Sequence, residues 1–139
     1  MSGIGENQFD TKILSAEDSD ALGQAVELLG QGLPVAMPTE TVYGLAADAL
    51  SSEAVARIFE AKGRPANNPL IVHVDSAAMA RDCVYAWPSA ADQLASAFWP
   101  GPLSIVLPKA DSIPDIVTAG GVTVAVRCPA HPVMRDVLT

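Results

Sequence analysis

The stretch VTVAVRC, residues 122–128, alternates side chains with the period of two that a β-strand requires. Its three valines would share one face, and Thr123, Ala125 and Arg127 the other. An arginine is costly to bury in so apolar a strand unless it is paired or faces water. The stretch therefore predicts a strand lining a cleft, with Thr123 and Arg127 about 13 Å apart at two ends of a ligand, or an arginine that reaches solvent at the strand end.

The stretch PLIVHV, residues 69–74, predicts a second strand with the same alternation. In it Ile71 and His73 share the face opposite the two valines. A lone histidine in such a strand is either a core residue satisfied by its neighbours or a group that points into a site, and both interpretations stay open. Two more apolar runs, LPVAM at 33–37 and LSIVLP at 103–108, predict further strands.

Helical patterns alternate with these strands. SSEAVARIFEAKG, residues 51–63, opens on a capping serine, repeats apolar residues every three or four positions and closes on glycine. Further helices are expected from about residue 19, where Asp18 is the expected N-cap, and around residues 76–82, 89–98 and 131–138. This interleaving predicts an α/β (α+β) fold in which helices cover a sheet, with residues 1–14 as a flexible N-terminal arm and residues 15–139 as one domain.

Composition narrows the classes of function. Half of the 139 residues are hydrophobic, which is enough for a packed core. The net charge of −8 argues against a general nucleic-acid-binding surface. The two cysteines, Cys83 and Cys128, have no metal-ligand spacing and suit a reducing compartment. No apolar run approaches the ~20 residues of a membrane span, so we expect a soluble, cytoplasmic protein.

Two loops carry polar residues that a core does not explain. Thr41, in PTETVYGLAADA (38–49), follows a buried strand, and its hydroxyl either satisfies a turn or contacts a ligand. In KGRPANNPLIVHV (62–74), Lys62 either complements a helix C-terminus or joins Arg64 on phosphate oxygens. Asn68 either forms a turn before Pro69 or donates to a ligand.

Four motifs occur in one order: PTETVYGLAADA, AKGRPANNPLIVHV, WPGPLSIVLP and VTVAVRCPAHP. The same order is seen in the YrdC-like family of threonylcarbamoyl-adenylate synthases, which the chain resembles from about residue 15 to residue 139. The resemblance implies a twisted mixed sheet flanked by helices around an open cleft. It also implies synthesis of threonylcarbamoyl-adenylate and pyrophosphate from L-threonine, bicarbonate and ATP, for N6-threonylcarbamoyladenosine modification of tRNA.

The resemblance also implies roles for single residues. It implies catalytic phosphate contacts from Lys62 and Arg64, ATP contacts from Arg64, Asn68 and Thr123, and L-threonine contacts from Thr41, His73 and Arg127. A Mg²⁺ ion would be held through the phosphates rather than by a protein metal site. The product would pass to a tRNA threonylcarbamoyl transferase. Of these assignments, Thr123 and Arg127 agree with the strand-face argument.

The chain departs from the family pattern at one place. The family carries a Ser-x-Asn motif beyond the PxHP segment that completes the nucleotide site, and none occurs in these 139 residues. We therefore expect the domain to be C-terminally incomplete. Two alternative functions use the same fold: formation of carbamoyl-adenylate, as in a domain of hydrogenase-maturation proteins, and double-stranded RNA binding without catalysis.

Overall fold

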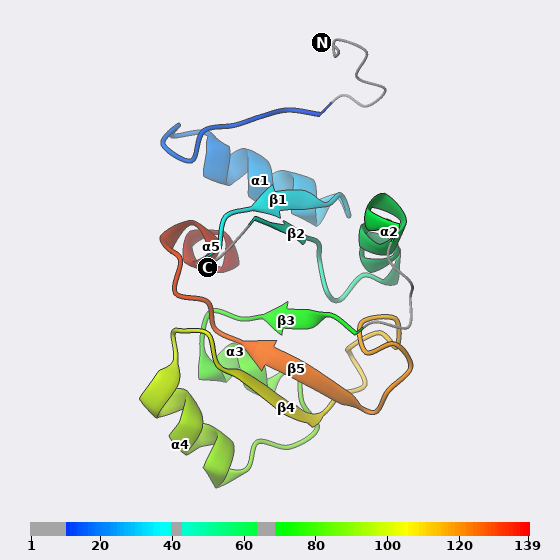
Figure 1. The fold of residues 1–139 in the computed structure, drawn as a ribbon, viewed down its shortest axis with the longest axis vertical. Coiled ribbons are helices and arrows are strands. Elements are labelled where there is room, and N and C mark those ends of the chain that lie inside the picture. Colours follow the sequence, from blue (N-terminus) through cyan, green and yellow to red (C-terminus); the bar gives the residue numbers. More distant parts are fainter. Residues whose placement is uncertain (1–10, 40–42, 64–68) are drawn as a thin grey trace.

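The computed structural model describes residues 11–39, 43–63 and 69–139. Helices and strands alternate along the chain, as the sequence predicts (Figure 1). In order they are α1 (Ala21–Gly30), β1 (Val35–Met37), β2 (Gly44–Ala46), α2 (Ser52–Lys62), β3 (Ile71–His73), α3 (Ala77–Arg81), α4 (Ser89–Phe98), β4 (Ser104–Pro108), β5 (Thr123–Arg127) and α5 (Pro132–Leu138).

The central element is a three-stranded mixed sheet in the order β3-β5-β4. Strand β5 pairs with β3 in parallel and with β4 antiparallel. A second sheet joins β1 to β2 as an antiparallel pair. The mixed α/β class is confirmed, and within the described residues the strands are divided between these two sheets.

Strand β2 differs from expectation, because the polar residues of 38–49 predict a loop. Its three residues, Gly-Leu-Ala, are too few to show a period of two. Pairing with β1 defines it, with Val35 opposite Ala46 and Met37 opposite Gly44. A strand of this kind depends on its partner rather than on its own sequence.

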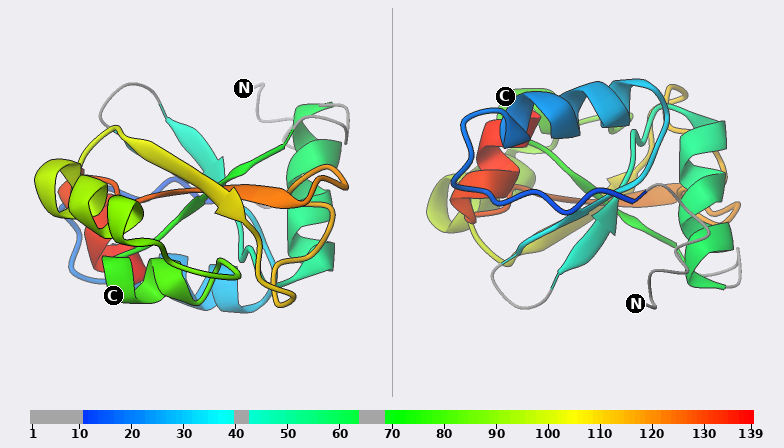
Figure 2. Two further views of the ribbon diagram at one scale, coloured as in Figure 1. Left: turned by 90° about the horizontal axis from the view of Figure 1, so that it is seen from below. Right: turned by 90° about the horizontal axis from the view of Figure 1, so that it is seen from above.

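The hydrophobic core lies against one face of the three-stranded sheet. Val72, Val124 and Val126 point into it and are almost fully buried. Side chains from α2, α3, α4 and the loop between β4 and β5 complete this cluster, including Val55, Phe59, Ala80, Ala91, Ala95, Ile113 and Val117. Figure 2 shows α2 at one end of the strands and α4 and α5 at the other. The opposite face of the sheet is left for other contacts.

Helix α2 has the boundaries that its sequence predicts. The Ser51 side chain accepts a hydrogen bond from the Ala54 amide at 3.2 Å, and Gly63 ends the helix in the left-handed conformation with φ of 61°. Helix α1 differs from expectation, since it begins at Ala21 after Asp20, and Asp20 makes no side-chain capping bond. The caps of α2 place Lys62 on its last turn, directly before the Gly63 cap.

Arg57 joins helix α2 to the turn between α1 and β1. The spacing of Arg57 from Glu53 and Glu60 on the helix predicts a surface ion pair, but its guanidinium donates to the Gly32 carbonyl in the turn between α1 and β1. This contact spans 25 residues of sequence, so local helix spacing does not reveal it. Helix α1 also packs against α5 and β1. Among the described residues, no helix has the length and apolar character needed to cross a bilayer.

Candidate active site

The face of the three-stranded sheet opposite the core carries the polar residues. Strand register places His73, Arg127 and Ser104 in one row across β3, β5 and β4. In the next row, Ile71 and Val106 flank Ala125 and are 46% and 59% exposed. The two strand faces predicted for residues 69–74 and 122–128 are therefore confirmed. We call this surface the open face.

Arg127 is half-buried at the end of β5. Its Nε donates a hydrogen bond to the Gly101 carbonyl at 3.0 Å. Gly101 belongs to the turn WPGP, which contains a cis bond between Trp99 and Pro100. The guanidinium is thus held against the backbone of a turn rather than extended into solvent. The arginine is therefore paired within the protein, and its role in a ligand cleft stays a prediction.

A hollow of about 210 Å³ opens at the other end of the same face. Its lining is mostly apolar with two threonines: Pro69, Leu70, Ile71, Val106, Thr118, Thr123 and Ala125. Thr123 stands at the start of β5 and Arg127 at its end. The small side chain of Ala125 lies between them on the same face, and it leaves room there. This arrangement suits one ligand group in the hollow and another beside Arg127.

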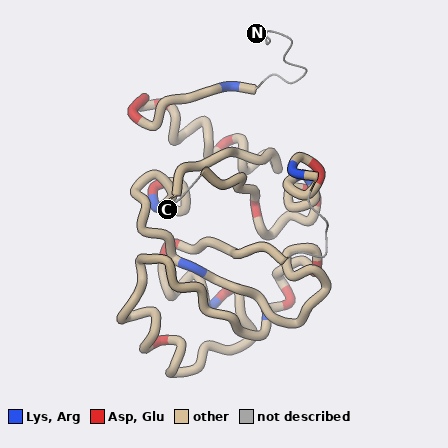
Figure 3. Tube along the Cα trace, viewed as in Figure 1, with Lys and Arg blue, Asp and Glu red and all other residues tan. Residues whose placement is uncertain are grey.

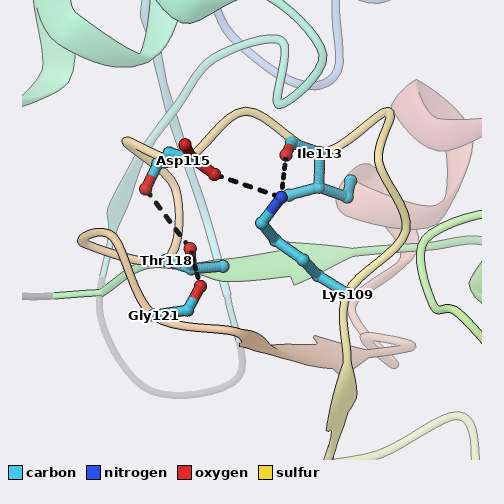
Figure 4. A network of polar contacts seen from close by, with 5 residues as sticks. All are labelled: Lys109, Ile113, Asp115, Thr118 and Gly121. Carbon is cyan, nitrogen blue, oxygen red and sulfur yellow. Dashed lines mark hydrogen bonds and ion pairs between the residues drawn. The ribbon is translucent and has the colours of Figure 1, made fainter.

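The wall of the hollow is stiffened by a polar network in the loop between β4 and β5 (Figure 4). The hydroxyl of Thr118, which is 5% exposed, lies 2.7 Å from the Gly121 carbonyl oxygen and 3.2 Å from that of Asp115. Lys109 Nζ lies 3.0 Å from the Ile113 carbonyl oxygen and 3.2 Å from Asp115 Oδ1. In these contacts side chains bond to backbone carbonyl oxygens of the loop, which in a flexible loop would bond to water instead.

The same loop is attached to the start of β3. The Leu70 amide donates to the Val117 carbonyl at 2.8 Å, and the Lys109 amide donates to the Val122 carbonyl at 2.9 Å. Ala119 and Gly120 turn the chain with φ of 54° and 79°. The position of Thr118 beside the hollow therefore follows from bonds to two strands rather than from its own loop alone.

We predict that Thr118→Val destabilises the protein by about 1–2 kcal/mol, because valine keeps the shape of the side chain but removes the hydrogen bond to Gly121. Urea unfolding followed by circular dichroism measures the change in the free energy of unfolding. Thr118→Ser is the matched control, since it retains the hydroxyl. If the valine variant were as stable as the wild type while serine destabilised the protein, packing rather than the hydrogen bond would hold this loop.

The predicted phosphate-binding residues are only partly described. Lys62 is exposed at the end of α2. Helix α2 lies beside the end of the strands at which β5 starts (Figure 2), and Thr123, the first residue of β5, lines the hollow. The Lys62 ammonium makes no hydrogen bond or ion pair within the described part of the chain. Thr41, Arg64 and Asn68 lie outside the described residues. Their placement stays a prediction, while His73, Thr123 and Arg127 are found on one face.

Ser104 is a further candidate site residue, which the sequence motifs do not single out. It is half-buried beside Arg127 on the open face. Its hydroxyl has no protein partner in residues 11–39, 43–63 and 69–139. Alternation within LSIVLP predicts that Ser104 points to the face of β4 opposite the one that Ile105 buries. Only the register between β4 and β5 shows that Ser104 adjoins Arg127.

Basic residues are few and separated in the described part of the chain (Figure 3). They lie in the N-terminal segment, in α2, α3 and α5, at the end of β5 and just after β4: Lys12, Arg57, Lys62, Arg81, Lys109, Arg127 and Arg135. Duplex binding uses a continuous basic surface. The distribution among these residues supports small-anion recognition at one or two cations over a broad nucleic-acid interface.

Comparisons with known proteins show which family the chain is similar to. The family model Sua5/YciO/YrdC, described as telomere recombination, matches residues 27–139. The threonylcarbamoyl-AMP synthase of Pyrococcus abyssi is 53% identical over 109 residues, which are 78% of this chain and 32% of that protein. The threonylcarbamoyl-AMP synthase of Bacillus subtilis is 48% identical over 123 residues, which are 88% of this chain and 35% of that protein.

A solved structure gives the same result for the fold. The crystal structure of Pyrococcus abyssi Sua5 complexed with L-threonine matches with a TM-score of 0.81 and 50% sequence identity. The match covers 84% of this chain and 34% of that one. This chain therefore spans about a third of the length of these relatives. The fold class predicted from the interleaved strands and helices is confirmed.

Proposed function

The chain belongs to the Sua5/YciO/YrdC family, and from this premise we propose that it synthesises threonylcarbamoyl-adenylate and pyrophosphate from L-threonine, bicarbonate and ATP. The observation that carries the proposal is the two-ended open face. The row of His73, Arg127 and Ser104 lies at one end, and the hollow beside Thr123 lies at the other. An amino acid and a nucleotide can then lie side by side along β5.

Arg127 is the proposed partner of the threonine carboxylate. A guanidinium presents paired N–H donors in a planar fork that matches a carboxylate. Its Nε is occupied by the Gly101 carbonyl, so the fork would form at the terminal nitrogens. His73 and Ser104 flank Arg127 in register and supply groups that can bond to the amine or hydroxyl of threonine. We assign Thr41 to the same end on the resemblance of its motif.

The hollow is the proposed site for part of the nucleotide. Its apolar lining and the Thr123 hydroxyl suit a group that is flat and polar at its edges. Lys62 ends α2 at this end of the strands. Lys62 would contact the phosphates as a point charge, together with Asn68 and with the bidentate guanidinium of Arg64. The reacting α-phosphorus would then lie between the hollow and Arg127.

The proposed chemistry uses these residues for positioning and charge. The threonine amine takes up bicarbonate as a carbamate with loss of water, and a carbamate oxygen then attacks the α-phosphorus. The bond to the β-phosphate oxygen breaks, and pyrophosphate leaves. Negative charge grows on the phosphate oxygens during this step, and Lys62 and Arg64 would stabilise it. No covalent enzyme intermediate is required.

We propose that Mg²⁺ arrives on the phosphates of ATP. The described residues contain no group of three or more His, Cys, Asp or Glu side chains placed to hold a metal ion. When bound, the ion would neutralise phosphate charge. We further propose that the reaction occurs in the cytoplasm and that the adenylate passes to a tRNA threonylcarbamoyl transferase.

The test is an assay of pyrophosphate release with omission controls. We expect release that requires both ATP and L-threonine, with the mass of threonylcarbamoyl-adenylate found in the products. Carbamoyl phosphate in place of threonine gives release only if the chain forms carbamoyl-adenylate. Duplex RNA is added in a separate salt titration. Threonine-independent release, or RNA binding with a steep salt slope and no turnover, would contradict the proposal.

A further inference from the structure

We propose that Gly101 is a positioning residue for Arg127. Its carbonyl fixes the direction in which the guanidinium faces the open face, so that the turn WPGP belongs functionally to the amino-acid end of the site. The kinetic part of this inference rests on the proposed function, because it takes Arg127 as the partner of the threonine carboxylate. The contact itself does not depend on that assignment.

Two hydrogen bonds join Gly101 to the end of β5. Arg127 Nε donates to the Gly101 carbonyl at 3.0 Å, and the Gly101 amide donates to the Cys128 carbonyl at 2.8 Å. One bond holds the side chain and the other holds the backbone beside it. The turn therefore cannot move away from the strand without also moving the guanidinium.

The turn is itself held on both sides of Gly101. Trp99 donates its backbone amide to the Ala95 carbonyl at 2.9 Å at the end of α4. Its indole Nε1 donates to the Leu103 carbonyl at 2.8 Å, directly before β4. The Gly101 carbonyl is thus a rigid acceptor rather than one member of a mobile loop.

Space explains why this position is glycine. Gly101 is buried, and a Cβ added to it would lie 2.6 Å from the Phe98 carbonyl oxygen. That oxygen belongs to the backbone at the end of α4, so it cannot move aside as a flexible side chain does. Any larger residue must displace the turn, and with it the acceptor for Arg127.

The functional consequence follows from arginine chemistry. An arginine side chain has several rotatable bonds, and only some orientations present its fork to a ligand. Anchoring Nε removes most of that freedom before the ligand arrives, which lowers the entropic cost of binding. Displacing the anchor should weaken threonine binding while the hollow at the far end of β5 keeps its affinity for ATP.

A spectroscopic experiment tests the contact without requiring catalysis. In a ¹H–¹⁵N correlation spectrum, the Arg127 Nε–H signal is assigned by its loss in Arg127→Lys. We expect this proton to exchange with water more slowly than that of Arg81, whose side chain is 57% exposed. Gly101→Ala should abolish the slow exchange while the backbone spectrum stays dispersed. Equal exchange of the two protons in the wild type would refute the inference.

Kinetics then separate positioning from mere stability. Gly101→Ala should raise the KM for threonine roughly 10- to 100-fold and leave the KM for ATP unchanged. In an Arg127→Lys background the same substitution should add little, because the partner is already lost. An equal loss in both backgrounds, or a fall in kcat alone, would show that Gly101 acts only on folding.

Trp99→Phe is the second variant, for the case in which Gly101→Ala does not fold. It removes the bond to Leu103 but keeps an aromatic ring, and it should raise the KM for threonine in the same direction by a smaller factor. If slow exchange of Arg127 Nε–H is lost in the variants but the wild type turns over no threonine, the positioning contact stands and the proposed function fails. If the wild type is active and neither variant changes the exchange or the KM, the inference fails alone.

Discussion

Arg127→Ala is expected to weaken threonine binding by a factor on the order of 100, because truncating one partner of a buried charged pair costs about 2–5 kcal/mol. The substitution removes the half-buried cation from the row it forms with His73 and Ser104. Isothermal titration with threonine, and the KM for threonine in the pyrophosphate assay, measure the effect. The KM for ATP should change little, since the hollow lies at the opposite end of β5.

The matched control for this prediction is Arg81→Ala. Arg81 is an arginine on the surface, where it pairs with Asp92 at 3.2 Å and is largely exposed. Exposed pairs of this kind contribute little to stability, so the control should bind threonine like the wild type. If a folded Arg127→Ala protein bound threonine as tightly as the wild type, Arg127 would not be part of the site. The proposed two-ended arrangement would then be wrong as well.

Arg64→Ala should reduce threonine-dependent pyrophosphate release by a factor on the order of 10² to 10³, because we propose that this cation stabilises charge developing on the phosphates. The fold should be intact, since Arg64 follows in the sequence after the Gly63 cap that ends α2. Single-turnover measurements with saturating ATP and threonine report the chemical step. Circular dichroism and the unfolding midpoint check the fold.

Arg64→Lys distinguishes charge from geometry. Lysine keeps the positive charge but lacks the bidentate fork, so this variant should recover part of the lost rate. Lys62→Ala, tested alongside, should also lower the rate if both cations face the phosphates. An Arg64→Ala protein with normal folding and normal activity would exclude Arg64 from the chemistry while leaving the assignment of Arg127 intact.

Much of the site could be predicted from residues near one another in the sequence. The alternation in 122–128 and 69–74 assigns Arg127 and His73 to faces of their strands, and both assignments are confirmed. The caps of α2 at Ser51 and Gly63 were equally readable, because a cap is a contact between residues three or four positions apart. The four ordered motifs indicated the family that the comparisons confirm.

Other features could not be read in this way. Nothing local to LSIVLP shows that Ser104 adjoins Arg127, since that neighbour is set by the register of β4 against β5. The contact of Arg57 with Gly32 and the anchor of Arg127 on Gly101 join residues 25 and 26 positions apart. Strand β2 exists through its pairing with β1.

The sequence by itself indicated the family, and it determined the elements other than β2 and the way their side chains point. These properties depend on spacings of two to four residues, over which backbone geometry is nearly fixed. Only the tertiary structure decided which side chains are neighbours and where the hollow lies, because register and loop attachment are chosen by packing the buried face of the sheet as a whole. The row of His73, Arg127 and Ser104 on the open face is a consequence of that packing.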